Sequence, residues 1–261
     1  MKYNAKDFTL PIKTVLEKCT DMRKWVDEKN KFDLGNPQAL YTYNKCIFKI
    51  LEDITLFLDV SKDNPNNLIP TAGLRRCITA IILEHTKAKK VIEIGTGASA
   101  IMALLFARNN VEVIATEINE SSFLQAQKHI EINKVEAQVT LVKSEGGILN
   151  YLEEDYFPAD CVLSLPPYYG EKTKIPPKKK GFQGIESELY SFGEETDFSL
   201  RLFDEWYDTG SIAYLCILWK NIEAMQKALL TKKNFQVQTQ QFEIKAGTRT
   251  RILTIMKHNN F

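Results

Sequence analysis

The sequence predicts an α/β fold in which a mostly parallel, doubly wound sheet follows a small helical region. Three observations carry this prediction. Short β-branched or apolar runs alternate with helical patterns through the middle of the 261-residue chain. A glycine-containing turn, "GTGASA", joins the first of these runs to a helix. A later run ends in "LSLPPYYG", and a central strand cannot continue through two prolines.

The first part of the chain is predicted to be helical. Apolar residues recur at helical spacing in "LPIKTVLEKCTDMRKWVDEKN", and "NPQALYTYNKCIFKILEDI" begins with Asn36 as a cap and Pro37 at the first helical position. The turn-rich "SKDNPNN" breaks this pattern. We therefore place a helical N-terminal region at 1–67 and a larger α/β domain at 68–261, opening with a helix in "TAGLRRCITAIILEHTK".

Five runs are predicted to form the sheet, and helical patterns separate several of them. The runs are 89–95, 111–118, 137–144, 159–165 and 212–219, and the clearest intervening helices are 98–109 and 121–133. Near the end, "FQVQTQQFEI" and "RTRILTIMK" flank "KAGT", which predicts an antiparallel strand pair added to the sheet.

Composition excludes several classes of protein. The 34 Lys+Arg balance 33 Asp+Glu, so the global charge does not indicate a nucleic-acid binder and any basic surface is local. Five scattered cysteines without a CxxC pair argue against a disulfide framework or a zinc site, and we expect no metal. No signal core or membrane-length apolar run occurs, so we expect a soluble intracellular protein of the cytoplasm or nucleus, without a membrane partner.

The segment "VIEIGTGASA" predicts a nucleotide cofactor. Gly95 and Gly97 follow the first strand and let the backbone approach a ligand closely. Glu117, at the end of the second strand, can accept hydrogen bonds from both ribose hydroxyls of an adenosine cofactor. Glu93 lies two residues before the first glycine, as in the E-x-G-x-G of many methyltransferases, and this favours S-adenosylmethionine over a nicotinamide cofactor.

The proline-terminated fourth strand predicts the substrate end of the site, because ligands of open α/β sheets bind beyond the carboxyl ends of the strands. The backbone carbonyls of Leu165 and Pro166 can accept hydrogen bonds from an exocyclic amine, and the two prolines keep this backbone rigid. Tyr168 can stack on a flat base. Leu165, Pro166, Pro167 and Tyr168 are therefore the candidate catalytic element.

The segment after the two tyrosines is basic and predicts contacts with RNA. Between Gly170 and Gly181 five lysines accompany one glutamate, and they can hold phosphates on either side of a target base. A solvated loop is the alternative interpretation. The candidate RNA-binding residues are Tyr169, Lys172, Lys174, Lys178, Lys179, Lys180, Arg249 and Arg251.

From about residue 33 to 257 the chain resembles the adenosine-N6 RNA methyltransferase family that contains the U6 snRNA enzyme methyltransferase-like protein sixteen and bacterial 23S rRNA adenine-N6 enzymes. "NPQAL", "NLIPTAGLR", "IEIGTGASAI" and "ATEI" are similar to the family's DPEAV, LIPTxPLR, DIGTGAS and ATEVD segments. "LPPYY" stands where the family has NPPFF, and "SFGEETDFSLRLFDE" and "AGTRTR" resemble its GGE and GRTxRW segments. The resemblance implies a Rossmann-like class I methyltransferase fold, S-adenosylmethionine as cofactor, and adenosine N6 methylation of a structured rRNA or snRNA.

The resemblance also implies roles for single residues. Arg75, from the LIPT segment, would pair with the carboxylate of the cofactor's methionine part. Gly95 would lie under the cofactor, and Glu117 would hold its ribose. Gly147 falls where family members have a threonine near the adenine, so only a backbone contact carries over.

Leu165 leaves more than one function open. The family has an asparagine here, whose side-chain oxygen accepts a hydrogen bond from the target amine, and leucine accepts none. Ser164 is expected to point to the opposite face of the strand. The chain is then either an RNA methyltransferase that uses backbone carbonyls or a catalytically impaired relative that binds RNA or a protein partner. A protein methyltransferase is less favoured, and a nicotinamide dehydrogenase less still, since no histidine is placed to handle a hydride transfer.

Overall fold

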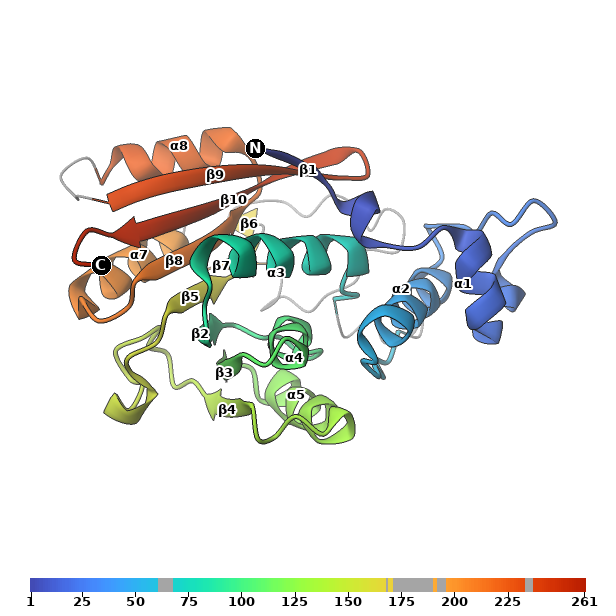
Figure 1. The fold of residues 1–261 in the computed structure, drawn as a ribbon, viewed down its shortest axis with the longest axis horizontal. Helices are drawn as coiled ribbons and strands as arrows, with labels where there is room; N and C mark the ends of the chain where they lie inside the picture. Colours follow the sequence, from blue (N-terminus) through green and yellow to red (C-terminus); the bar gives the residue numbers. More distant parts are fainter. Residues whose placement is uncertain (61–67, 168, 171–189, 192–195, 233–236) are drawn as a thin grey trace.

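Five parallel strands, largely buried on both faces, form the centre of this computed structural model, which describes residues 1–60, 68–167, 169–170, 190–191, 196–232 and 237–261 (Figure 1). Within the described residues the main sheet has the order β1-β9-β10-β8-β5-β2-β3-β4, and only β10 runs antiparallel to its neighbours. Its strands are β1 (Lys2–Asn4), β2 (Lys90–Ile94), β3 (Glu112–Glu117), β4 (Val139–Lys143), β5 (Cys161–Ser164), β8 (Tyr214–Trp219), β9 (Val237–Ala246) and β10 (Arg249–His258).

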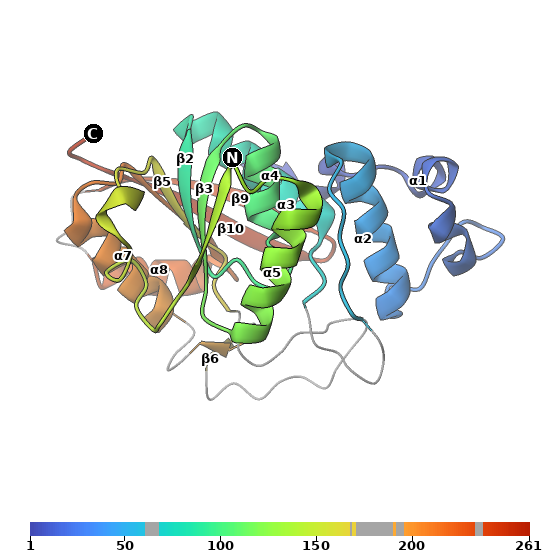
Figure 2. The ribbon, with the colours of Figure 1, turned by 90° about the horizontal axis from the view of Figure 1, so that it is seen from below.

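Helices cover both faces of the sheet. Figure 2 shows α7 and α8 on one face and α3, α4 and α5 on the other, with α2 and then α1 lying beyond them. The helices are α1 (Ile12–Lys18), α2 (Pro37–Glu52), α3 (Ala72–Thr86), α4 (Ile101–Arg108), α5 (Glu120–Asn133), α7 (Asp197–Thr209) and α8 (Ile222–Leu230), and the short 3₁₀ helices are η1 (Ala5–Phe8), η2 (Thr20–Trp25) and η3 (Glu154–Tyr156). Among the residues described, no helix is long and apolar enough to cross a membrane.

Side chains alternate between two apolar cores along the central strands, as the pleat of a sheet requires. Val113 and Ala115 of β3 pack in the core shared with α3 and α4, while Ile114 between them packs on the opposite face. The second core contains residues of α7 and α8, among them Trp206 and Met225. This two-sided burial explains why the strands appear as continuous apolar runs in the sequence.

The predicted architecture is confirmed, with differences at the N-terminal end. The parallel strands, the antiparallel C-terminal pair and the Asn36 cap are present, and Asn36 Oδ1 accepts hydrogen bonds from the N–H groups of Gln38 (3.0 Å) and Ala39 (3.2 Å). The first predicted helix is shorter, because α1 ends at Lys18 and η2 follows. The "SKDNPNN" stretch lies outside the described residues.

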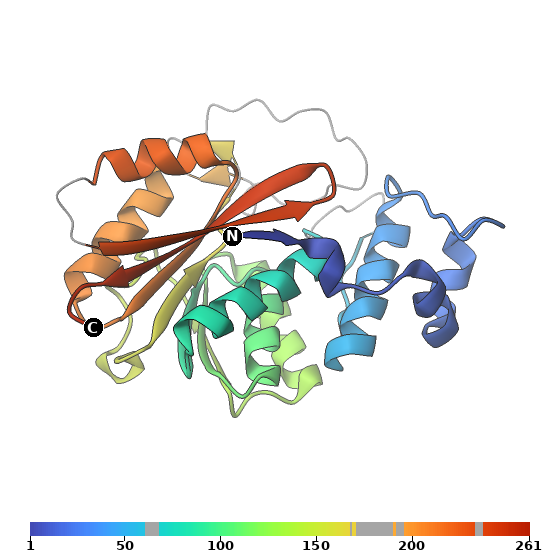
Figure 3. The ribbon, with the colours of Figure 1, turned by 45° about the horizontal axis from the view of Figure 1, so that its top comes forward.

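The chain begins with a strand that was not predicted. β1 pairs in parallel with β9, with Lys2 opposite Glu243 and Asn4 opposite Lys245. Figure 3 shows this strand, in dark blue, beside the long C-terminal strands in red. Three residues carry too short a pattern to be recognised as a strand, and the position of β1 depends on the edge that β9 offers.

Two of the five cysteines are paired, so the argument against disulfides from their scattered positions was wrong for this pair. Cys19, which follows α1, forms a disulfide with Cys46 of α2, 27 residues away. The other three, Cys77, Cys161 and Cys216, are buried free thiols. The spacing of the pair gives no sequence signal, because the two helices meet only in the folded chain.

Residues 54–60, here called the strap, follow α2 and its cap residue Asp53. Ile54, Leu56, Leu58 and Val60 are buried, and the residues between them are more exposed. Side chains that alternate in this way between buried and exposed are typical of an extended chain. Because the strap lies outside the main sheet, its backbone N–H and C=O groups need other partners.

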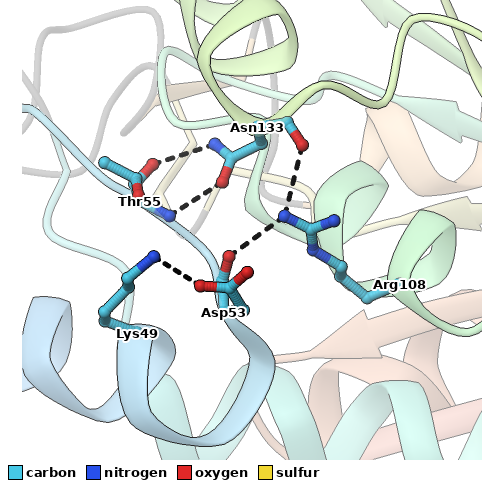
Figure 4. Close-up of polar contacts among 5 residues, drawn as sticks. All are labelled: Lys49, Asp53, Thr55, Arg108 and Asn133. Atoms are coloured by element: carbon cyan, nitrogen blue, oxygen red, sulfur yellow. Dashed lines mark hydrogen bonds and ion pairs between the residues drawn. The ribbon is translucent and has the colours of Figure 1, made fainter.

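Side chains of α5 bind one edge of the strap. Asn133 Oδ1 accepts from the Thr55 N–H (2.8 Å), and Asn133 Nδ2 donates to the Thr55 carbonyl (2.9 Å), as Figure 4 shows. His129 and Gln125 bind the backbone of Phe57. Two residues of extended chain advance about 6.6 Å, and four residues of helix advance about 6 Å, so successive contacts stay in register.

The other edge of the strap is bound from α2. The Tyr41 hydroxyl donates to the Leu56 carbonyl and accepts from the Leu58 N–H, both at 2.9 Å. At the start of the strap, Arg108 donates to the carbonyls of Asp53 (3.0 Å) and Asn133 (3.2 Å), which joins α4 to the same network (Figure 4). The strap therefore has helices on both sides and holds the N-terminal helices against the domain.

We expect Asn133→Ala to lower the free energy of unfolding by about 1–3 kcal/mol, because it leaves a partly buried N–H and a carbonyl of Thr55 without partners. Lys49→Ala is the control. It removes the exposed Lys49–Asp53 ion pair in the same network, and exposed ion pairs contribute little (Figure 4). Urea unfolding followed by circular dichroism measures both variants. Equal effects of the two substitutions would contradict the role given to Asn133.

Candidate cofactor and substrate site

The carboxyl ends of β2 and β5 lie side by side and bring the two predicted motifs together. In the parallel register Ile94 is opposite Ser164, so the segments that begin at Gly95 and Leu165 leave the sheet at the same edge. The Ser164 hydroxyl is buried and donates to the Ile94 carbonyl (3.2 Å). The glycine loop and the proline element are thus neighbours.

The backbone of the glycine loop is open to a ligand. Gly95 has a φ of +75° and Gly97 a φ of +66°, which glycine adopts without steric cost. A Cβ added at Gly95 would meet no atom within 4 Å, so the space beside this backbone is not filled by the protein. Residues 95–97 can therefore accept the close approach of a cofactor.

Glu117 holds the glycine loop in place. Its Oε2 accepts from the Gly97 N–H and its Oε1 from the Asn119 N–H, both at 2.8 Å, and the side chain is 7 % exposed. Each carboxylate oxygen retains acceptor capacity, so the ribose contact predicted for Glu117 is compatible with these bonds. That Glu117 also fixes the loop was not predicted from the sequence.

Glu93 lies directly beneath the loop. Its side chain is buried, and the Thr96 hydroxyl donates to its Oε2 (2.8 Å). Burial raises the pKa of Glu93 to about 7. The hydrogen bond from Thr96 and the positive charge of Arg75 oppose this rise, and the negative charge of Glu117 adds to it. The carboxyl group therefore changes its charge near neutral pH.

Arg75 brings a positive charge to this edge from α3. The residue is 8 % exposed, so it is not an arginine on a solvated helix surface. Its positive charge acts on Glu93. A guanidinium in this position can pair with the carboxylate of an amino-acid group, and the residues present therefore fit S-adenosylmethionine.

Gly147 has no room for a side chain. A Cβ at this position would lie 2.3 Å from Asn150 Oδ1 and 2.7 Å from Tyr151 Cδ1. The loop that contains it is joined to β3, since the Ser144 N–H donates to the Glu117 carbonyl and the Ser144 hydroxyl to the Gly147 carbonyl. Gly147 can contact a ligand only through its backbone.

Leu165 packs against the apolar core on the α3–α4 face, which is also the face of Arg75. The side chain is partly buried and offers no hydrogen-bond acceptor. Pro166 and Pro167 line a small cavity with Ser199 and Trp219. The Oγ of Ser199 and the Nε1 of Trp219 are buried, and neither has a hydrogen-bond partner among the residues that the structure describes.

The structure places some of the predicted RNA-binding residues and leaves others undescribed. Ile252 of β10 pairs with Trp219, so the start of β10, with Arg249 and Arg251, lies at the edge where β8 ends. Arg249 is exposed, and Arg251 donates to the Lys220 carbonyl (3.4 Å). Tyr169 begins the two-residue strand β6 (Tyr169–Gly170), which pairs with β7 (Tyr190–Ser191). Tyr168, Lys172, Lys174, Lys178, Lys179 and Lys180 lie outside the described residues.

Several residues of the site were not predicted from the sequence. Thr96 lies between the two glycines and supplies the hydroxyl that binds Glu93, a role that its place in the loop could have suggested. Ile118, directly after Glu117, is 53 % exposed and offers an apolar surface at the cofactor end of β3. Ser199 and Trp219 reach the proline element only through the tertiary fold.

No cluster of three or more metal-ligating side chains occurs in the described part of the chain.

Two named proteins are similar in sequence to most of this chain. A methyltransferase of Methanocaldococcus jannaschii is 28% identical over 94% of this chain and 97% of its own length. The U6 small nuclear RNA (adenine-(43)-N(6))-methyltransferase of Schizosaccharomyces pombe is 25% identical over 74% of this chain and 53% of its own length. The chain thus spans about half the length of that eukaryotic relative.

Solved structures establish the fold. The human METTL16 catalytic domain in complex with the MAT2A 3′UTR hairpin 6 has a TM-score of 0.77 at 20% identity and covers 97% of this chain and 94% of that one. The N-terminal domain of human METTL16 in complex with SAH has a TM-score of 0.76 at 19% identity and covers 98% of this chain and 99% of that one. These likenesses confirm a Rossmann-like methyltransferase fold.

The family model for RNA methyltransferases matches residues 3–253, which is nearly the whole chain. This match includes the glycine loop, both acids and the proline element. The chain therefore belongs to the RNA methyltransferase family.

Proposed function

We propose that this protein uses S-adenosylmethionine to methylate the N6 amine of an adenosine in a structured RNA. The observation that carries the proposal is the shared edge of β2 and β5, where an open glycine loop lies beside a rigid proline element. Family membership supports the reaction class. The relative from S. pombe is named for an adenine of U6 snRNA, and the similar human structures contain an RNA hairpin or SAH.

The residues around the loop supply what this cofactor needs. Gly95 leaves room for it, and Glu117 has acceptor capacity for ribose hydroxyls. Arg75 would pair with the carboxylate of the methionine part, and ionised Glu93 would balance the positive charge of its ammonium group. When bound, S-adenosylmethionine supplies an activated methyl group.

At the substrate end, the chain offers backbone rather than side-chain acceptors. The carbonyls of Leu165 and Pro166 would accept hydrogen bonds from the N6 amine, and the prolines fix their direction. The amine nitrogen would form a bond to the methyl carbon while the bond from that carbon to the sulfonium sulfur breaks, the sulfur would leave as a neutral thioether, and the methylated amine would release a proton to solvent. Tyr168, which lies outside the described residues, is proposed to stack on the base.

A second candidate function is an RNA-binding protein that has lost most of its catalytic rate. Leu165 is the observation that favours it, because loss of one positioned polar group from a transition-state site typically costs about 10²–10³ in rate. The cofactor residues Arg75, Glu93 and Glu117 remain in place, and they favour the enzyme.

The RNA partner is proposed to be a folded RNA with an accessible adenosine, bound by the lysines at positions 172, 174 and 178–180, together with Arg249 and Arg251. The near-neutral charge of the chain leaves a role for a protein partner that adds positive surface. Such an activity would operate in the cytoplasm or nucleus.

We expect the wild-type protein to bind S-adenosylmethionine and to transfer methyl groups slowly, and we expect Leu165→Asn to raise the transfer rate up to about 100-fold. The asparagine returns a side-chain acceptor for the amine. Calorimetry measures binding. Tritium transfer to total RNA, followed by nucleoside chromatography, measures the rate and identifies the product as N6-methyladenosine.

Leu165→Met is the matched control, because it changes the shape of the side chain without adding an amide oxygen, and it is expected to leave the rate near wild type. Absence of cofactor binding by the wild-type protein would overturn the proposed function. Binding with transfer only by the asparagine variant would establish the second candidate.

We expect S-adenosylmethionine to bind more tightly as the pH rises from 6 to 8, with the change levelling off above about 7. Below the pKa of Glu93 most of the protein carries a neutral carboxyl group, which must lose its proton to balance the cationic cofactor. The dissociation constant of S-adenosylmethionine is expected to fall by at most about tenfold between pH 6 and pH 8. Calorimetry across this range measures the wild type and Glu93→Gln, whose affinity is expected to stay weak and flat. Equal pH slopes in both proteins would contradict this role.

A further inference from the structure

His129 joins the strap to the glycine loop. This side chain of α5 is fully buried, and its ring stacks on Phe57 at a centroid distance of 4.1 Å. Its Nε2 lies 3.1 Å from the Phe57 backbone nitrogen. Its Nδ1 lies 2.9 Å from the carbonyl oxygen of Ala98, which follows Gly97 in the loop, and 2.9 Å from the carbonyl of Gln125.

These partners determine where the ring proton lies. A backbone N–H can only donate, so Nε2 must accept from Phe57 and carries no hydrogen. The single proton of the neutral ring is then on Nδ1, from which it is donated to Ala98 and shared with Gln125. Burial lowers the pKa of His129 and keeps the ring in this neutral form. Each ring nitrogen therefore has a separate function.

The backbone of the loop is also bound by β3, where the Gly95 N–H donates to the Thr116 hydroxyl (3.3 Å). The N–H of Thr96 donates to the Thr116 carbonyl and the N–H of Gly97 to Glu117, and both bonds tie the loop to β3. On the other side, Ala98 packs with Leu58 and other apolar residues at the far end of the strap. The bond from His129 is the polar connection between Ala98 and α5 that the described residues contain.

We propose that His129 is a positioning residue for the cofactor: its Nδ1–H holds the Ala98 carbonyl, and so keeps residues 95–98 in the conformation that receives S-adenosylmethionine. This inference rests on the proposed function. Through the same ring the strap and the N-terminal helices are linked to the loop, so a local change at His129 alters cofactor affinity without touching the cofactor.

The two ring nitrogens can be tested separately. The amide of asparagine reaches the Nδ1 position and that of glutamine the Nε2 position, so His129→Asn keeps a donor for Ala98 and His129→Gln keeps an acceptor for Phe57. We expect His129→Asn to bind S-adenosylmethionine within about threefold of wild type and His129→Gln to bind about tenfold more weakly, as loss of one hydrogen bond allows. At saturating cofactor, kcat of the glutamine variant should stay near wild type while KM for the cofactor rises.

Asn133→Ala is the matched control, because Asn133 binds the same strap one helical turn away and donates to the His129 backbone carbonyl (2.8 Å), while no hydrogen bond joins it to the loop in the described part of the chain. We expect it to lower the unfolding temperature without changing the cofactor Kd. If Asn133→Ala weakens cofactor binding as much as His129→Gln, or if His129→Gln binds normally, the inference is wrong and the proposed function stands. If the wild-type protein binds no cofactor, the proposed function fails, and the inference fails with it.

A second measurement needs no variant. NMR of protein labelled with ¹⁵N-histidine distinguishes the two neutral tautomers by their nitrogen shifts. We expect the Nδ1–H form at His129 and a change of its Nδ1 shift when S-adenosylmethionine is added. An Nε2–H tautomer would overturn the assignment, because that form cannot accept a hydrogen bond from Phe57.

Discussion

The need to satisfy the backbone of residues 54–60 shapes the connection between the N-terminal helices and the rest of the protein. An extended segment outside a sheet leaves its N–H and C=O groups without strand partners, and unpaired buried groups are costly. Here Asn133, His129 and Gln125 of α5 serve one edge, and Tyr41 of α2 serves the other. The segment is thus bound as a strand would be, by side chains in place of a neighbouring strand.

The candidate site uses its two acids in different ways. Both oxygens of Glu117 accept backbone N–H groups, and this fixes the loop. Glu93 accepts from Thr96 but is fully buried, and burial dominates, so its pKa rises to about 7. The hydrogen bond from Thr96 and, to a smaller extent, the positive charge of Arg75 oppose this rise. A cofactor with a positive ammonium and a negative carboxylate complements this mixed set of charges.

Much of the fold and of the cofactor loop could be predicted from the sequence, because buried parallel strands and a glycine turn have strong local patterns. The contacts of the strap could not, although the alternation in "ITLFLDV" was a signal for an extended segment that was not used. The pairing of Cys19 with Cys46 and the cavity beside Ser199 and Trp219 depend on residues that meet only in the folded chain. The contact of Glu117 with the loop could not be predicted, because its partner is the backbone N–H of Gly97, which has no sequence signal.

Leu165 lies in a different part of the site from the residues proposed to hold the cofactor. The charges of Arg75 and Glu117 act on Glu93, and Glu117 also binds the Gly97 N–H, so these residues determine the charge and the conformation of the loop. Leu165 packs on the core, and its backbone leaves the sheet beside Gly95 whatever side chain it carries. A change of substrate or of rate can therefore occur at this position while the cofactor site is retained, because the register of β2 and β5, and not the side chain, brings the two motifs together.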